Sequence, residues 1–134
     1  MTKYKTQGFR KTFKNARKGL RIVLKSERNI RIHFLVGALA LLCGVALELS
    51  ATRICIVLMA ISLVVGFEMI NSAIEFSLDA VFHNKYSTLV GMAKDISAGA
   101  VMFATIVAVA IGFIIYIPAI INLYYKCTLG LPVV

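Results

Sequence analysis

The sequence predicts an all-α integral membrane protein with three transmembrane helices and an N-terminal amphipathic helix on the membrane surface. Of the 134 residues, 60% are hydrophobic and only 16% are charged, and the mean hydropathy is +0.86. Soluble domains usually carry about 25% charged residues. Eleven of the fifteen Lys and Arg residues lie in the first 31 positions, ahead of the apolar runs. The composition excludes a disordered chain, and three widely separated cysteines do not indicate a disulfide scaffold.

The N-terminal segment, 5–28, is predicted to form the surface helix. Its apolar residues recur at helical spacing among the basic ones: Phe9, Phe13, Ala16, Leu20, Val23 and Leu24. A helix of this kind lies in the membrane interface. A basic arm also occurs in nucleic-acid-binding proteins, but the apolar body that follows favours a membrane, so we expect no nucleic-acid partner.

Three apolar runs indicate spans, which require roughly 20 residues each. The first run, 32–47, is somewhat short, but Glu48 and the residues beside it can lie at the interface. We expect transmembrane helices over 30–49, 54–78 and 96–118. Because basic residues that flank spans stay cytoplasmic, we expect a multi-pass protein of the cell (cytoplasmic) membrane with its N-terminus inside. The chain is expected to form a single domain.

The connections follow from the same runs. A tight outer turn is expected to join the first two spans, and a cytoplasmic loop over 80–95 to join the second and third. That loop would contain His83, Lys85, Lys94 and Asp95. The third span is expected to end near Pro118, which leaves 119–134 as an extracytoplasmic tail.

Three of the six acidic residues lie in one short segment at the inner end of the second span: Glu68, Glu75 and Asp79. At about 100° per residue, Glu75 and Asp79 each lie about 20° from Glu68 in projection, and Asn71 lies about 60° away. The four side chains therefore share one stripe of the helix, called the polar stripe below. A carboxylate at membrane depth costs at least about 2.5–3.5 kcal/mol, so the stripe indicates a functional site.

Only one cation, Lys94, is expected near the polar stripe, and one lysine cannot neutralise three acids. A divalent cation is the simplest solution, because Mg²⁺ prefers one or two carboxylates plus substrate phosphates. A metal, a cation and a carboxylate that orients a hydroxyl are also the parts that phosphoryl transfer uses. No glycine-rich nucleotide motif is present. From the residues alone, a membrane enzyme and an ion-coupled transporter both stay open.

These residues resemble those of a known family. The pattern Glu68-x-x-Asn71-Ser72-Ala73-Ile74-Glu75-x-x-x-Asp79 is similar to the signature of the small prokaryotic diacylglycerol kinases, which also include undecaprenol kinases. Ala93-Lys94-Asp95 follows at the expected distance. The segments that begin at Glu27, Leu47 and Ile117 resemble the Gram-positive branch of that family. The resemblance covers about residues 8–120.

The resemblance implies a homotrimer that transfers the γ-phosphoryl group of MgATP to a lipid hydroxyl at the cytoplasmic interface. It implies that Glu68 accepts the hydroxyl proton and that Asn71 positions the reacting groups. Glu27 and Glu75 are implied ligands of Mg²⁺ and nucleotide. Further contacts with ATP are implied for Lys85, Tyr86, Lys94 and Asp95. The Gram-positive-like segments favour undecaprenol as the acceptor over diacylglycerol.

Four of these residues also have plainer interpretations. Glu27 could form a salt bridge with a basic neighbour, and Asn71 could serve only as a hydrogen bond between helices. Asp95 could cap the third span, since helix caps favour Asp. Lys94 could be only a topology signal.

Overall fold

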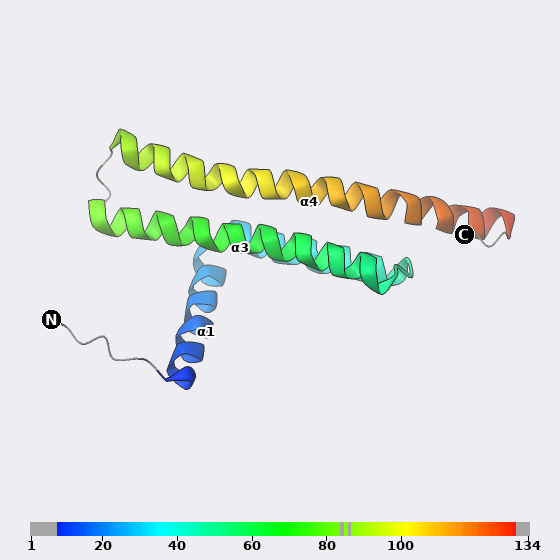
Figure 1. Ribbon diagram of the computed structural model, residues 1–134, viewed down its shortest axis with the longest axis horizontal. Helices are drawn as coiled ribbons and strands as arrows, with labels where there is room; N and C mark the ends of the chain where they lie inside the picture. The colour runs from blue at the N-terminus through cyan, green and yellow to red at the C-terminus, as the bar shows by residue number, and fades with distance from the viewer. Residues whose placement is uncertain (1–7, 84, 86, 131–134) are drawn as a thin grey trace.

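The computed structural model describes residues 8–83, 85 and 87–130, and in this part of the chain it consists of helices and short connections (Figure 1). The elements are α1 (Phe9–Ser26), α2 (Arg28–Ala46), α3 (Ala51–Phe82) and α4 (Thr88–Leu129). Helices α2 and α4 both pack against α3, and α1 projects away from this bundle.

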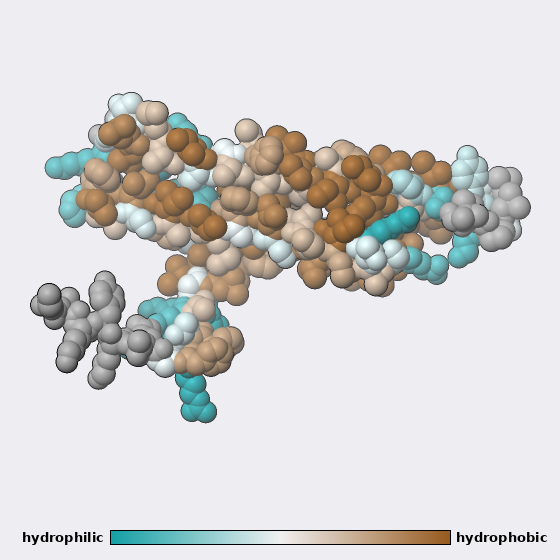
Figure 2. Space-filling model, viewed as in Figure 1, coloured by the Kyte–Doolittle hydropathy of each residue, from teal (hydrophilic) through white to brown (hydrophobic). Residues whose placement is uncertain are grey.

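Helices α2, α3 and α4 are each long and apolar enough to cross a membrane. Large apolar side chains face outward along them, and Leu42, Met59 and Ile114 are 65%, 69% and 73% exposed. Figure 2 shows the apolar surface as a band between hydrophilic ends. An apolar surface of this extent needs lipid around it, and the expectation of a multi-pass membrane protein is confirmed.

The helices extend further than the apolar runs. Helix α3 begins at Ala51 rather than near residue 54, and α4 begins at Thr88. The connection between α3 and α4 is therefore 83–87, and the expected loop over 80–95 is wrong: Lys94 and Asp95 lie on α4. The reason is that the end of an apolar run marks the edge of the membrane, whereas a helix can continue into the polar region beyond it.

Helix α4 does not end near Pro118 but continues to Leu129, with Gly130 as its left-handed C-cap. Proline removes one backbone N–H and its ring clashes with the preceding turn. Membrane helices tolerate this where neighbouring groups compensate. Ala119, directly after the proline, is only 7% exposed, so packing holds the helix beyond Pro118. Much of the expected tail over 119–134 is thus helical.

The turn between α2 and α3 is closed by backbone hydrogen bonds. The N–H of Leu49 donates to the carbonyl of Gly44 and the N–H of Glu48 donates to that of Val45, both at 3.0 Å. This is the Schellman pattern, and Glu48 occupies its left-handed position with φ 55°. The turn brings α3 back along α2.

Two glycines set how closely α2 approaches α3. A Cβ at Gly37 would lie 2.8 Å from Ile61 Cγ2, and one at Gly44 would lie 2.8 Å from Ile54 Cδ1. Both glycines are buried. Small residues allow membrane helices to approach each other in this way.

We therefore expect Gly37→Val to destabilise the protein by about 1–3 kcal/mol, since overpacking forces neighbouring side chains apart. The measurement is thermal unfolding in detergent. Gly66→Val on α3 is the matched control, because a Cβ there meets nothing within 4 Å. An equal loss of stability in both variants would show that the cost arises from the helix itself and not from the α2–α3 contact.

Candidate active site between α3 and α4

The polar stripe of α3 lies where the sequence predicts it. Of its four residues, Glu68 is the most buried and lies furthest from the α3–α4 connection. Glu68 is 4% exposed and Ser72, one turn further on, is 2% exposed. The Ser72 hydroxyl donates to the Glu68 backbone carbonyl at 3.0 Å. Among the described residues, no hydrogen bond or ion pair engages the Glu68 carboxylate. A carboxylate without a protein partner, on a residue that is otherwise buried, is available to a substrate proton.

Asn71 is held between two helices. Its Nδ2 donates to Glu75 Oε1 at 3.1 Å, along α3. Its Oδ1 accepts a hydrogen bond from Ser97 Oγ of α4 at 2.6 Å. The amide is thus fixed at both ends. Asn71 forms the interhelical hydrogen bond of the plainer interpretation, and that bond also orients its Nδ2 toward Glu75.

Lys94 reaches the stripe from α4. Its Nζ lies 2.6 Å from Asp79 Oδ1, and the two side chains are 34% and 39% exposed. The pair is therefore open to solvent at the edge of the site. Lys94 is paired with Asp79, the acid of the stripe nearest the α3–α4 connection. Glu68 and Glu75 therefore have no cation from the described chain. Three carboxylates against one ammonium leave a site that attracts further positive charge.

The other predicted site residues surround this centre less closely. Lys85 is exposed in the α3–α4 connection, and Asp95 is exposed on α4. Asp95 does not cap the helix, because the N-cap is Ser87, two turns earlier. Tyr86 lies outside the described residues. The structure therefore brings Glu68, Asn71, Glu75 and Lys94 to one α3–α4 face.

Glu27 lies at the corner between α1 and α2, half-buried and in extended conformation with φ −100° and ψ 118°. The Arg31 guanidinium donates to the Leu24 and Lys25 carbonyls across this corner, at 3.1 and 3.0 Å. The salt bridge considered for Glu27 does not form within the described chain. Its carboxylate stays available for another ligand.

No three acidic, histidine or cysteine side chains of the described residues come together as a complete metal cage. The donor set still fits Mg²⁺, since this ion keeps several waters and uses one or two carboxylates with substrate phosphates. Glu75 offers one such carboxylate, with one oxygen already oriented by Asn71.

Ser97 is the site residue that the sequence did not single out. Ser97 Oγ lies 2.6 Å from Asn71 Oδ1 and 2.9 Å from the Lys94 carbonyl oxygen, so its hydroxyl can donate to either. One signal was present: Ser97 lies three residues after Lys94, which places both on one face of a helix. The predicted loop over 80–95 hid that spacing.

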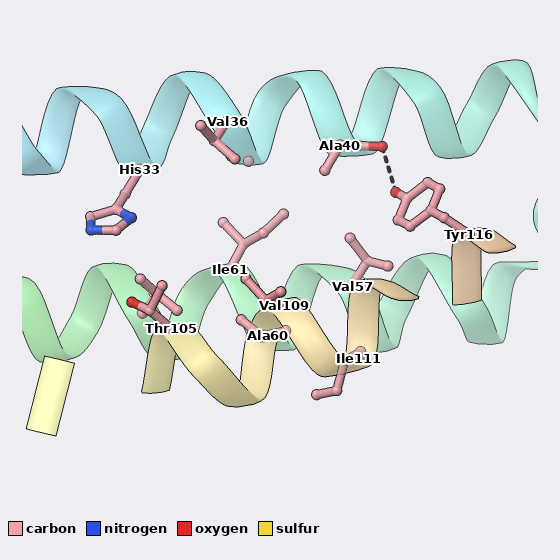
Figure 3. Close-up of a pocket in the computed structure, with 14 residues that line it drawn as sticks. His33, Val36, Ala40, Val57, Ala60, Ile61, Thr105, Val109, Ile111 and Tyr116 are labelled. Atoms are coloured by element: carbon pink, nitrogen blue, oxygen red, sulfur yellow. Dashed lines mark hydrogen bonds between the residues drawn. The ribbon is translucent and has the colours of Figure 1, made fainter. Parts of the chain in front are cut away.

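An apolar pocket of about 200 Å³ lies between α2, α3 and α4, further toward the α2–α3 turn (Figure 3). Its α3 wall includes Val57, Ile61 and Val64, which continue the polar stripe along the same helix face. The Tyr116 hydroxyl donates to the Ala40 carbonyl at 2.5 Å at one end, and His33 lies toward the other.

Fold and site together define a small multi-pass helical membrane protein with a carboxylate-rich site at one end of its bundle. Comparison with known sequences adds the family. The profile of the prokaryotic diacylglycerol kinases matches residues 14–116, and the chain belongs to this family of prokaryotic lipid kinases. The family predicted from the motifs is therefore confirmed.

Three relatives with known names are similar to this chain in sequence. The undecaprenol kinase of Bacillus subtilis (strain 168) is 33% identical over 110 residues, which cover 82% of this chain and 89% of the relative. The diacylglycerol kinase of Synechocystis sp. is 31% identical over 112 residues, 84% of this chain and 64% of the relative. That of Escherichia coli (strain K12) is 35% identical over 107 residues, 78% and 87% respectively.

Proposed function

We propose that this protein is an ATP-dependent lipid kinase that transfers the γ-phosphoryl group of MgATP to the hydroxyl group of undecaprenol. The observation that carries the proposal is the unpartnered carboxylate of Glu68, a residue that is only 4% exposed, beside the Asn71–Glu75–Ser97 network. The family membership supports the reaction class, and relatives named for undecaprenol and for diacylglycerol support a lipid acceptor.

In the proposed reaction, Glu68 accepts the proton of the lipid hydroxyl while its oxygen attacks the γ-phosphorus in line and the bond to the β-phosphate oxygen breaks. The product is a lipid phosphate, and ADP leaves. Asn71, fixed between Glu75 and Ser97, holds the reacting groups in place. Lys94 offsets the charge on the transferring phosphoryl group, as cations do in phosphoryl transfer.

Glu75 and Glu27 are the proposed Mg²⁺ ligands. The ion would neutralise charge on the nucleotide phosphates. The excess of carboxylates over cations in the polar stripe supports this assignment. Lys85, Tyr86 and Asp95, near the α3–α4 connection, are proposed to contact the nucleotide.

The proposed orientation places the polar stripe at the cytoplasmic face of the cell membrane, the N-terminus inside and the C-terminal end of α4 outside. Helix α1 would lie on the inner surface, with its basic residues near anionic lipid headgroups. We also propose a homotrimer. The absence of any cation for Glu68 and Glu75 within the described residues supports a site that is completed by nucleotide-bound metal and by a neighbouring subunit.

Undecaprenol is proposed as the acceptor over diacylglycerol. The apolar pocket ends at Val64, one turn from Glu68 on the same face of α3. The hydroxyl-bearing end of a single hydrocarbon chain in this pocket would lie toward Glu68, whereas diacylglycerol carries two chains beside its hydroxyl.

A competition assay tests the acceptor. Radiolabelled ATP is offered with undecaprenol, diacylglycerol and ceramide at equal concentrations in detergent, and the label in each extracted lipid is counted. We expect undecaprenol phosphate to predominate. Predominant label in phosphatidic acid would assign the acceptor to diacylglycerol. No label in any lipid, together with uptake of ions or protons into vesicles without ATP consumption, would support an ion-coupled transporter instead.

Ser97→Ala is expected to lower kcat about tenfold, because it removes one hydrogen bond to Asn71 that is worth about 1.4 kcal/mol when its partner must stay aligned. Initial rates at saturating ATP and lipid provide the measurement. Ser77→Ala is the matched control, since the Ser77 hydroxyl donates only to the Ala73 carbonyl of its own helix. Equal values of kcat for both variants would show that Ser97 does not contribute to the site.

A further inference from the structure

The charged side chains at the other end of the bundle converge on one cavity. Outside the first 31 residues and the site region 68–95, the chain has three charged residues: Glu48, Arg53 and Lys126. All three line a cavity of about 240 Å³ between the α2–α3 turn and the C-terminal part of α4. Three separate segments of the chain thus bring all the charge of this end to one place.

The α4 wall of this cavity comes from beyond the region shared with the family, which ends at residue 116. Its members, spaced by three and four residues, share one helix face: Ala119, Asn122, Leu123 and Lys126. Helix α4 continues past Pro118 (Figure 1). This continuation therefore builds the wall of the cavity. A helix that ended at Pro118 would leave the α2–α3 turn uncovered.

The chemistry of the cavity suits an anion. Lys126 Nζ lies 3.6 Å from Glu48 Oε2, and the side chains are 65% and 82% exposed. An exposed pair at this distance is weak. Within the described residues, no hydrogen bond or ion pair engages the Arg53 guanidinium or the Asn122 amide. Two cations against one carboxylate leave a net charge of +1, and a guanidinium matches the oxygens of a phosphate.

Two tyrosines place the cavity at the level of lipid headgroups. Tyr124 and Tyr125 directly precede Lys126 and are 64% and 44% exposed. Their rings contact edge to face, with centroids 6.0 Å apart. Tyrosine is enriched at the membrane–water interface. The phosphates of phospholipids lie at the same level.

We propose that this cavity binds the phosphate of an anionic phospholipid from the leaflet at that end of the bundle. The Arg53 guanidinium and the Lys126 ammonium bind the phosphate oxygens, and Asn122 donates from α4. The lipid then links the C-terminal part of α4 to the α2–α3 turn. The proposal does not depend on kinase activity, because the polar stripe lies at the opposite end of α3.

The chain contains no tryptophan, so Tyr124→Trp gives a single fluorescent reporter beside the cavity. The protein is placed in vesicles of phosphatidylcholine and phosphatidylglycerol, and one lipid at a time carries bromine near its headgroup to quench the reporter. We expect quenching that corresponds to about a fivefold preference for phosphatidylglycerol, the effect of roughly one basic residue at a membrane surface.

Variants on the reporter background separate the possible causes. Arg53→Gln with Lys126→Gln should abolish the preference, and Glu48→Gln should increase it by removing the competing carboxylate. Arg53→Lys should reduce it, since the charge stays but the planar fork is lost. Arg28→Gln, at the other end of the bundle, should leave it unchanged.

Three results would overturn the proposal. Equal quenching by both brominated lipids would mean that the cavity selects no anionic lipid. A preference that survives in the Arg53→Gln, Lys126→Gln variant would place its cause elsewhere. Loss of the preference on addition of millimolar inorganic phosphate, at constant ionic strength, would identify a soluble anion as the occupant.

Discussion

Glu68→Gln is expected to lower kcat for lipid phosphorylation by about 10²–10⁴, the range that general base catalysis contributes. Glutamine keeps the size of the side chain but cannot accept the hydroxyl proton as a carboxylate does. Glu68 is 4% exposed, so solvent is a poor substitute. Because Glu68 acts on the lipid hydroxyl, the KM for ATP should change little. Steady-state kinetics over a range of ATP concentrations provide both values.

The control for this variant is Ser62→Ala on the same helix, where the hydroxyl donates only to the Leu58 carbonyl. Both variants should elute as the wild type does on size exclusion in detergent. A rise in KM for ATP with unchanged kcat in Glu68→Gln would move this residue from the acceptor to the nucleotide, and the proposed proton transfer would be wrong.

Lys94→Met is expected to lower kcat about 10²–10³-fold, the loss found when one group that stabilises developing charge is removed. Asp79→Asn should cost much less. The Lys94–Asp79 pair is about one-third exposed on each side, and exposed pairs contribute little to stability. Lys94 can therefore leave Asp79 for a phosphate oxygen at a small cost. Rates of the two single variants at saturating substrates test this difference.

The double variant Lys94→Met, Asp79→Asn distinguishes catalysis from structure. If Lys94 only neutralised Asp79, removal of both charges would restore activity. We expect the double variant to be as slow as Lys94→Met alone, and Lys94→Arg to recover part of the rate by keeping the charge. Recovery in the double variant would reduce Lys94 to a structural partner.

The arrangement of helices could be predicted from hydropathy, but their ends could not. Apolar runs identify α2, α3 and α4 because membrane insertion depends on the number of consecutive apolar residues. Hydropathy places Lys94 and Asp95 in a loop, because charge ends an apolar run. Pro118 is expected to end α4, yet the burial of Ala119 directly beyond it outweighs the lost N–H. Contacts of this kind are tertiary and leave no local signal.

The site was predictable where it depends on the period of one helix. Glu68, Asn71 and Glu75 share a face because of their spacing alone. Ser97 was missed because serine is common in membrane helices and its role depends on which residue of α3 lies opposite. The pairing of Lys94 with Asp79 likewise depends on the register between α3 and α4, which a single sequence does not specify.

The most direct test of the proposed mechanism is transfer of label from γ-labelled ATP into undecaprenol by the wild type and by the double variant Glu68→Gln, Glu75→Gln. Both proteins are assayed in the same detergent and lipid after their folding has been matched by circular dichroism. We predict organic-soluble label from the wild type and only the protein-free background from the variant. Label at a rate near that of the wild type would contradict the assignment of the polar stripe as the phosphoryl-transfer site.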